Sequence, residues 1–350
     1  MLLNKGVWFQ EYIDNPFLIN GLKFDLRLYI LLTSIDPVKI FIYEEGLVRF
    51  ATAQYSNDPK EIGNNFIHLT NYSVNKTSNE FVFNEMPGQY EGHKWNLRTL
   101  WKYFDEELGI DWRPVWEATK DVCVKTVLCG REQIRAEFDK KLKSEYSCYK
   151  LFGFDIFFDS DLKPWLLEVN NIPSLHINTI DAFVNRPMVA EMFNILGFHI
   201  PKAITSKHQK AIEDKLKLDH SDQSLGHDHR IYSRLRNKED IAKQEKFSCA
   251  ALKSDDYKER ILDNLSPADI RILLRAEDEL SQTCDWTRIF PTHSSSPALQ
   301  FISPPSYSDC LLAAWENKYG ADQESRQQGR DVLSQLCSQK IHLRLIDWAI

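Results

Sequence analysis

The sequence predicts an α+β fold in residues 1–201, followed by a charged linker over 202–256 and a helical region over 257–350. Three observations support this organisation. Alternating polar and apolar residues near the start indicate strands, and apolar residues three and four positions apart further along indicate helices. Two apolar runs separated by turn residues then indicate a β-hairpin. Strands and helices that are grouped separately along a chain are typical of the α+β class.

The first strands are expected at the very start of the chain. Residues Lys5–Ile13 form an apolar strand with no turn, helix or cap before it, which predicts that the chain begins part-way through a domain. Residues 20–52 continue as an antiparallel meander, because Asp36–Pro37 and Glu45–Gly46 are turn signals between apolar runs. The strand 5–13 would be an ordinary edge strand if it bound nothing.

Charged residues follow one face of this meander. Lys23, Asp25 and Arg27 alternate with apolar residues, and Arg49 lies on the strand after the second predicted turn. Charges on a strand face are costly unless they meet solvent, each other or a ligand. The pattern therefore fits either a cradle for an anionic ligand such as phosphate or a solvated sheet face, and it does not separate the two.

The middle of the chain is expected to be a polar loop followed by helices. Residues 66–76 offer hydroxyls and amides for hydrogen bonding, and His68 beside an apolar run is expected to be structural rather than a general base. Helical spacing begins near residue 94, and Pro114 opens a second helix. Asp181–Leu196 is predicted to form a third.

The predicted hairpin carries three oxygen-bearing side chains. It pairs Leu151–Phe158 with Lys163–Asn170 through a turn at 159–161. Glu168 and Asn170 are two apart on one strand and share a face, and pairing brings Asp155 beside them. Such hard oxygen ligands suit Mg²⁺. The alternative is a hairpin whose polar residues simply face solvent.

The C-terminal region is predicted from cap signals. Ser266, Pro267 and Asp269 are typical of the start of a helix, which extends to about Ser281. A proline-rich loop follows, and then two helices over roughly 306–318 and 326–338. The linker before this region mixes charges of both signs and is expected to be flexible or loosely helical.

Composition excludes several classes of protein. The chain has 350 residues, 43% hydrophobic and 27% charged, with a formal net charge of -7. This balance is normal for a globular protein and gives no sign of nucleic-acid binding. No stretch approaches the ~18 apolar residues of a membrane span, and the apolar run at the start of the sequence is too short to predict a signal peptide. Seven cysteines without a C-x-x-C pair favour reduced thiols, so the expectation is a cytosolic protein that binds neither nucleic acid nor membrane.

Several of these motifs resemble the tubulin-tyrosine-ligase-like family, ATP-grasp enzymes that join an amino acid to a protein carboxylate. The motifs are KFDLR, GLVRF, HLTN followed by Y-S, and GFDIFFDSDLKPWLLEVN followed by PSLH. Ile172 departs from the family pattern, which has serine there. The run SPADIRILLRAEDE with RIFPTH resembles the tail of one polyglutamylase branch, the fourth of vertebrates. The resemblance implies a partial ATP-grasp fold whose earlier lobe, expected before Lys5, is missing.

The resemblance also implies roles for individual residues. The metal ligands would be Asp155, Glu168 and Asn170. The ATP-binding residues would be Gln10, Glu11, Tyr12, Ile13, Lys23, Asp25, Thr70 and Asn71. The glutamate-binding residues would be Arg49, Tyr72, Ser73 and Lys94. Arg27 and Arg49 would be catalytic, Arg27 by neutralising phosphate charge and Arg49 by pairing with a carboxylate of the incoming amino acid.

The function implied by the resemblance is that of an ATP- and Mg²⁺-dependent polyglutamylase. Such a ligase would add free L-glutamate through an isopeptide bond to side-chain carboxylates of tubulin tails, and to other acidic proteins such as histone chaperones. The expected location is the cytoplasm and cytoskeleton, including the cilium or basal body, with the linker as a candidate microtubule-contacting segment. Two alternatives stay open. One is a truncated, non-catalytic tubulin-binding module, and the other is a ligase for glycine or tyrosine.

Overall fold

A computed structural model of the chain describes residues 11–84, 86–141, 149–177, 180–197, 236–250, 260–302 and 304–344. These residues form two compact units. Unit 1 comprises the described parts of Met1–Ile30, Tyr43–Cys123 and Leu151–Pro187. Unit 2 comprises the described parts of Leu31–Ile42, Val124–Lys150 and Met188–Ile350. The boundaries predicted near residues 201 and 256 lie outside the described residues and stay predictions.

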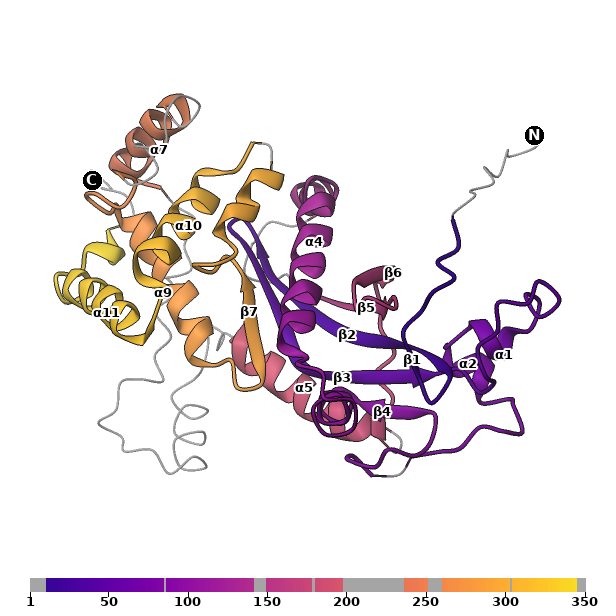
Figure 1. Ribbon diagram of the computed structural model, residues 1–350. Coiled ribbons are helices and arrows are strands. Elements are labelled where there is room, and N and C mark those ends of the chain that lie inside the picture. Colours follow the sequence, from indigo (N-terminus) through magenta and orange to yellow (C-terminus); the bar gives the residue numbers. More distant parts are fainter. Residues whose placement is uncertain are drawn as a thin grey trace, which may run out of the picture. The chain divides into compact units, whose positions relative to one another are not determined.

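The strands confirm the predicted antiparallel sheet. Within the described residues, seven strands form a sheet in the order β4-β3-β2-β5-β6, with β1 beside β2 and β7 beside β3 (Figure 1). Their bounds are Leu18–Ile19 (β1), Leu22–Ile35 (β2), Val38–Phe50 (β3), Lys94–Asn96 (β4), Lys150–Phe158 (β5), Pro164–Asn170 (β6) and Trp286–Phe290 (β7). The strand expected over 5–13 is not present in its described part, since residues 11–13 lie outside any strand.

The turn expected at Glu45–Gly46 is wrong, because β3 runs through both residues without a break. Glycine is required there by space rather than by a turn. A Cβ on Gly46 would lie 2.7 Å from the backbone oxygen of Arg27 on β2. Glu45 is buried and accepts a hydrogen bond from the Asn96 side chain at 2.7 Å. An acid followed by glycine can therefore mark either a turn or, as here, a buried acid beside a glycine that lets two strands approach closely.

The helices in the first 200 residues largely follow the predicted periodicity. Helix α3 spans Leu97–Tyr103 and continues as one π-helical turn to Leu108, and α4 spans Arg113–Lys141. Helix α5 spans Ile180–Leu196 and passes from unit 1 into unit 2. Residues 66–76, expected to be a loop, contain two short helical turns, α1 (Asn65–His68) and α2 (Tyr72–Asn75). The Asn64 side chain begins α1 by accepting a hydrogen bond from the backbone N–H of Phe66, a local cap that the polar composition concealed.

Four helices of unit 2 lie in the C-terminal half of the chain. They are α7 (Lys238–Ala250), α9 (Pro267–Ser281), α10 (Tyr307–Tyr319) and α11 (Gln323–Ser338). The predicted start of α9 is confirmed, since Ser266 and Asp269 form a reciprocal capping box. Strand β7 lies between α9 and the proline-rich loop, at residues to which the sequence analysis assigned no structure. None of the helices in the described ranges is long and apolar enough to cross a membrane.

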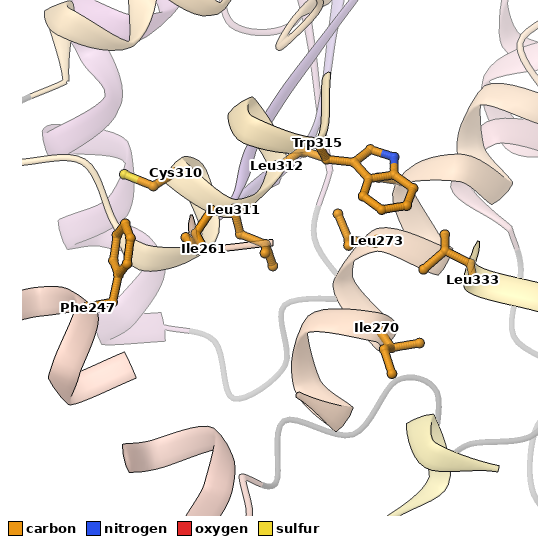
Figure 2. Packing of buried hydrophobic residues seen from close by; sticks show 10 residues of the cluster. Phe247, Ile261, Ile270, Leu273, Cys310, Leu311, Leu312, Trp315 and Leu333 are labelled. Atoms are coloured by element: carbon orange, nitrogen blue, oxygen red, sulfur yellow. The ribbon is translucent and has the colours of Figure 1, made fainter. Parts of the chain in front are cut away.

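The core of unit 2 joins these helices. Figure 2 shows Trp315 of α10 beside Leu273 of α9 and Leu333 of α11, all almost fully buried. The same unit holds the turn between β2 and β3. The backbone N–H of Val38 donates to Asp309 at 2.8 Å, and Arg131 donates to the same carboxylate at 2.7 Å. The C-terminal helices are thus hydrogen-bonded to the tip of the β2–β3 hairpin.

Candidate active site

The β5–β6 hairpin brings three of the predicted site residues to one face. Asp155 pairs with Glu168, and Gly153 pairs with Asn170. Directly paired residues of antiparallel strands point to the same side of a sheet, so the three oxygen-bearing side chains share a face, as predicted. The Asn170 amide donates to the Glu168 carboxylate at 2.8 Å. A bulge just beyond this pair leaves Leu167 as an extra residue.

Two arginines hold the Asp155 carboxylate. Arg27 donates to both of its oxygens, at 2.5 Å from Nε and 3.0 Å from Nη2. Arg49 donates from Nη2 to one of them at 2.7 Å, and also forms two hydrogen bonds with Asp25. Burial opposes ionisation of Asp155, but the two arginines nevertheless hold its pKa below the usual value. Two cations and two anions therefore neutralise one another in a buried network.

Lys94 extends this arrangement to β4. It pairs across the sheet with Arg49, and its ammonium donates to both oxygens of Asp181, at 2.7 and 2.6 Å. The Tyr72 ring lies 4.7 Å from the same ammonium, measured to the ring centroid. Burial lowers the pKa of Lys94, and the charge of Asp181 opposes that shift. Asp181 was not predicted as a site residue, and its one sequence signal was an acid in the first turn of the helix after the hairpin.

These residues form what we call the polar row: Lys94 on β4, Arg49 on β3, Asp25 and Arg27 on β2, Asp155 on β5, and Glu168 and Asn170 on β6. Every strand in the order β4-β3-β2-β5-β6 contributes at least one member. The charged face that was expected to be either solvated or ligand-binding is in fact largely buried, with Asp25 2% and Arg49 7% exposed. Its charges are satisfied mostly by one another.

Two of the residues assigned to ATP, Tyr12 and Lys23, form a second, smaller group with His68. The Tyr12 hydroxyl lies 3.0 Å from Nδ1 of His68 and 3.5 Å from Nζ of Lys23. The other ring nitrogen of His68 faces a backbone oxygen at 3.3 Å, in keeping with its expected structural role. Glu11 is exposed and Ile13 is half-buried, while Gln10 lies outside the described residues. Of the predicted ATP-binding residues, Lys23 and Tyr12 therefore lie in contact with each other.

The structure does not bring all predicted residues into contact. Thr70 is buried beside α1, whereas Asn71 and Ser73 are exposed. Within the described ranges, neither the Asn71 nor the Ser73 side chain hydrogen-bonds to a member of the polar row. Of the residues assigned to glutamate, Arg49, Lys94 and Tyr72 are neighbours and Ser73 is not among them, and the roles of all four stay predictions.

The residues of the polar row lie within the part of the chain that matches a known protein family. Residues 4–208 match the model of the tubulin-tyrosine ligase family, which is more than half of the sequence and includes the whole polar row. The chain belongs to the tubulin-tyrosine ligase family.

Curated relatives place it within this family. Tubulin monoglutamylase TTLL4 of Homo sapiens is 37% identical over 341 residues, which is 96% of this chain and 28% of the relative. Tubulin polyglutamylase ttll-4 of Caenorhabditis elegans is 35% identical over 339 residues, 95% of this chain and 52% of the relative. Tubulin polyglutamylase TTLL5 of Homo sapiens is 41% identical over 198 residues, 56% of this chain and 15% of the relative. The predicted branch is confirmed, and the chain spans between a quarter and about half of the TTLL4-type relatives.

The oxygen donors of this family member fit a magnesium ion. Asp155, Glu168 and Asn170 supply two carboxylates and an amide on one face, and Mg²⁺ in nucleotide sites typically takes one or two carboxylates plus phosphates and water. A site built wholly from protein groups is not indicated, since the described residues contain no cluster of three His, Cys, Asp or Glu suited to a metal. The adjoining arginines and lysines match the charge of a nucleotide's phosphates.

Asn75 is a residue of this region that the sequence analysis missed. It is completely buried, accepts hydrogen bonds from the backbone and hydroxyl of Thr52, and donates to the backbone oxygens of Leu69 and Asn71. It therefore fixes the segment containing α1 and α2 to the end of β3. An asparagine in a polar stretch carries no signal for such a role.

Replacing Asn75 with alanine is expected to lower the free energy of unfolding by about 2 kcal/mol, because the four hydrogen bonds of its fully buried side-chain amide are lost. Chemical denaturation measures this loss. Asn79→Ala, at an exposed position in the same stretch, is the control and should change little. Equal stability of the two variants would show that Asn75 does not anchor the segment.

Proposed function

We propose that this chain carries the metal- and amino-acid-binding part of an ATP-dependent ligase that joins glutamate to tubulin. The observation that carries the proposal is the polar row, in which cations for phosphate and carboxylate groups lie beside oxygen donors for a magnesium ion. Membership of the tubulin-tyrosine ligase family supports the reaction class. The names of the relatives, which act on tubulin as monoglutamylases or polyglutamylases, support the substrate.

Each part of the polar row has a proposed task. Asp155, Glu168 and Asn170 are oxygen donors for magnesium, which would supply charge neutralisation at the phosphates of ATP. Arg27, which is bound to Asp155, would stabilise charge on a transferred phosphoryl group. Arg49 and Lys94 would orient the carboxylates of incoming glutamate.

The proposed reaction has two stages. ATP phosphorylates a glutamate side-chain carboxylate of the target and releases ADP. The amino group of free glutamate then attacks the acyl phosphate, forming an isopeptide bond and releasing phosphate and a proton. The protein positions and neutralises the reactants without forming a bond to them. Cytoskeletal location, including cilia, and acidic histone chaperones as further targets extend the proposal by analogy with the branch.

The test is incorporation of labelled glutamate into tubulin with MgATP. Glu168→Gln removes one proposed metal-binding carboxylate at an exposed position, so the variant should remain folded and lose at least about 100-fold in rate. Asp161→Asn is the matched control, because Asp161 is an exposed acid of the same hairpin that lies in the turn. It should retain nearly full activity.

Each outcome selects one function. Loss in Glu168→Gln alone supports a glutamate ligase that uses the proposed site. Incorporation of labelled glycine or tyrosine in place of glutamate selects a different ligase. If no amino acid is incorporated while the folded chain still sediments with microtubules, the chain is a tubulin-binding module and the catalytic proposal is wrong.

A further inference from the structure

Gly153 lies on β5, two residues before Asp155. The lack of space for a side chain explains why this position holds glycine. A Cβ built on Gly153 would lie 2.9 Å from Cβ of Pro173, 3.1 Å from Cδ of Arg27 and 3.3 Å from Nε of Arg27. The first distance is shorter than real Cβ atoms show, and the other two are tight. The backbone at Gly153 does not adopt the left-handed conformation that favours glycine, so any side chain would be excluded by its neighbours rather than by strain.

The two residues that crowd position 153, Arg27 and Pro173, both affect the polar row. Arg27 reaches Asp155, two residues along β5, and its Nε is the atom that donates to Oδ1 of that carboxylate. The same Nε is among the atoms that a Cβ at position 153 would crowd. The Arg27 side chain, only 12% exposed, therefore lies against Gly153 on its way to Asp155.

Pro173 closes the other side of this space. It is buried, while the residues around it are exposed, including Ile172 at 88%. Gly153 also pairs across the hairpin with Asn170, the last of the three oxygen donors. Pro173 thus anchors the segment that follows the donors, and the absence of a side chain at 153 permits this anchoring.

We infer that Gly153 is a positioning residue, which lets Arg27 bind Asp155 and lets Pro173 fix the segment after Asn170. A methyl group at this position would displace the Arg27 guanidinium and would also crowd the Pro173 ring. The catalytic consequence rests on the proposed function, whereas the displacement of Arg27 does not.

The first experiment measures the rate of glutamate incorporation by Gly153→Ala. The expected result is a fall in kcat of about 10- to 100-fold with the KM for tubulin changed less than about threefold, because a displaced Arg27 acts on the reacting groups rather than on target binding. Gly63→Ala is the control, since a Cβ there meets nothing within 4 Å and should change neither value. A Gly153→Ala enzyme with wild-type kcat would overturn the inference.

A double-mutant cycle tests the link to Arg27 without relying on activity. Gly153→Ala is expected to lower the equilibrium constant for folding at least about tenfold in the wild-type chain. The reduction in the folding constant should be several-fold smaller in an Arg27→Ala background, where the crowded Cδ and Nε atoms are absent. Should the single variant fail to fold, recovery of folding in the double variant supports the inference. If Gly153→Ala lowered the folding constant equally in the wild-type and Arg27→Ala backgrounds, the inference would be overturned. A wild-type chain without ligase activity would refute the proposed function, but the double-mutant cycle would still test the role of Gly153.

Discussion

Replacing Arg49 with lysine is expected to reduce glutamate incorporation at least about 100-fold in a chain that remains folded. Arg49 donates to Asp25 from Nε at 2.8 Å and to Asp155 from Nη2 at 2.7 Å, so one guanidinium bridges two buried carboxylates. The two carboxylates raise the pKa of Arg49 although burial alone would lower it. A lysine ammonium keeps the charge but is a single point of donation, which cannot reproduce the fork.

The cause of this loss can be resolved by steady-state kinetics. If Arg49 mainly binds substrate glutamate, the KM for glutamate rises and kcat falls little. If it mainly holds Asp155 in place for the metal and for Arg27, kcat falls and the dependence on Mg²⁺ concentration shifts. The proposed role of Arg49 in orienting glutamate predicts the first result, and the second result would show that its contact with Asp155 matters more.

Arg98→Lys is the matched control for this experiment. Arg98 lies on α3, its side chain is 60% exposed, and its ion pair with Glu45 is long, at 3.6 Å. Lysine keeps the positive charge near Glu45 and the Arg98 side chain lies outside the polar row, so the variant should keep close to wild-type activity. Wild-type incorporation by Arg49→Lys would show that a bridging guanidinium is not needed.

The sequence predicted those parts of the site that follow from strand periodicity. Alternation placed Lys23, Asp25 and Arg27 on one face, and the two-residue spacing of Glu168 and Asn170 placed both beside Asp155. Local rules suffice for these residues, because side-chain direction in a strand repeats every two positions. The resemblance to a family then supplied roles that the pattern left open.

Features that depend on contacts between distant segments were not predictable in this way. The carboxylate that holds Lys94 comes from Asp181, 87 positions along the chain. The space at Gly153 is occupied by Arg27 and Pro173 from other segments. Gly46 was mistaken for a turn because a glycine required by a neighbouring strand and one required by a turn look alike in sequence.

Replacing Glu277 with glutamine in unit 2 is expected to lower the free energy of unfolding by about 3 kcal/mol at neutral pH. The Glu277 carboxylate is 7% exposed and accepts hydrogen bonds from Trp315 at 3.0 Å, Arg326 at 2.8 Å and Arg330 at 3.0 Å. Glutamine has the same shape but no charge, so the two arginines lose a buried anion. Urea denaturation measures the difference.

The effect of this substitution should depend on pH in a defined direction. Burial raises the pKa of Glu277, but the hydrogen bonds from Trp315, Arg326 and Arg330 and the charge of Arg326 bring it below the value of an unfolded glutamate, about 4.3. The stabilisation is therefore complete above that value and is lost as the pH falls through the folded-state pKa. The stability gap between wild type and Glu277→Gln should thus narrow between pH 6 and pH 3. Glu245→Gln, at an exposed position on α7, should show no such gap, and a gap for Glu277→Gln that stayed constant on acidification would mean that its charge does not contribute to folding.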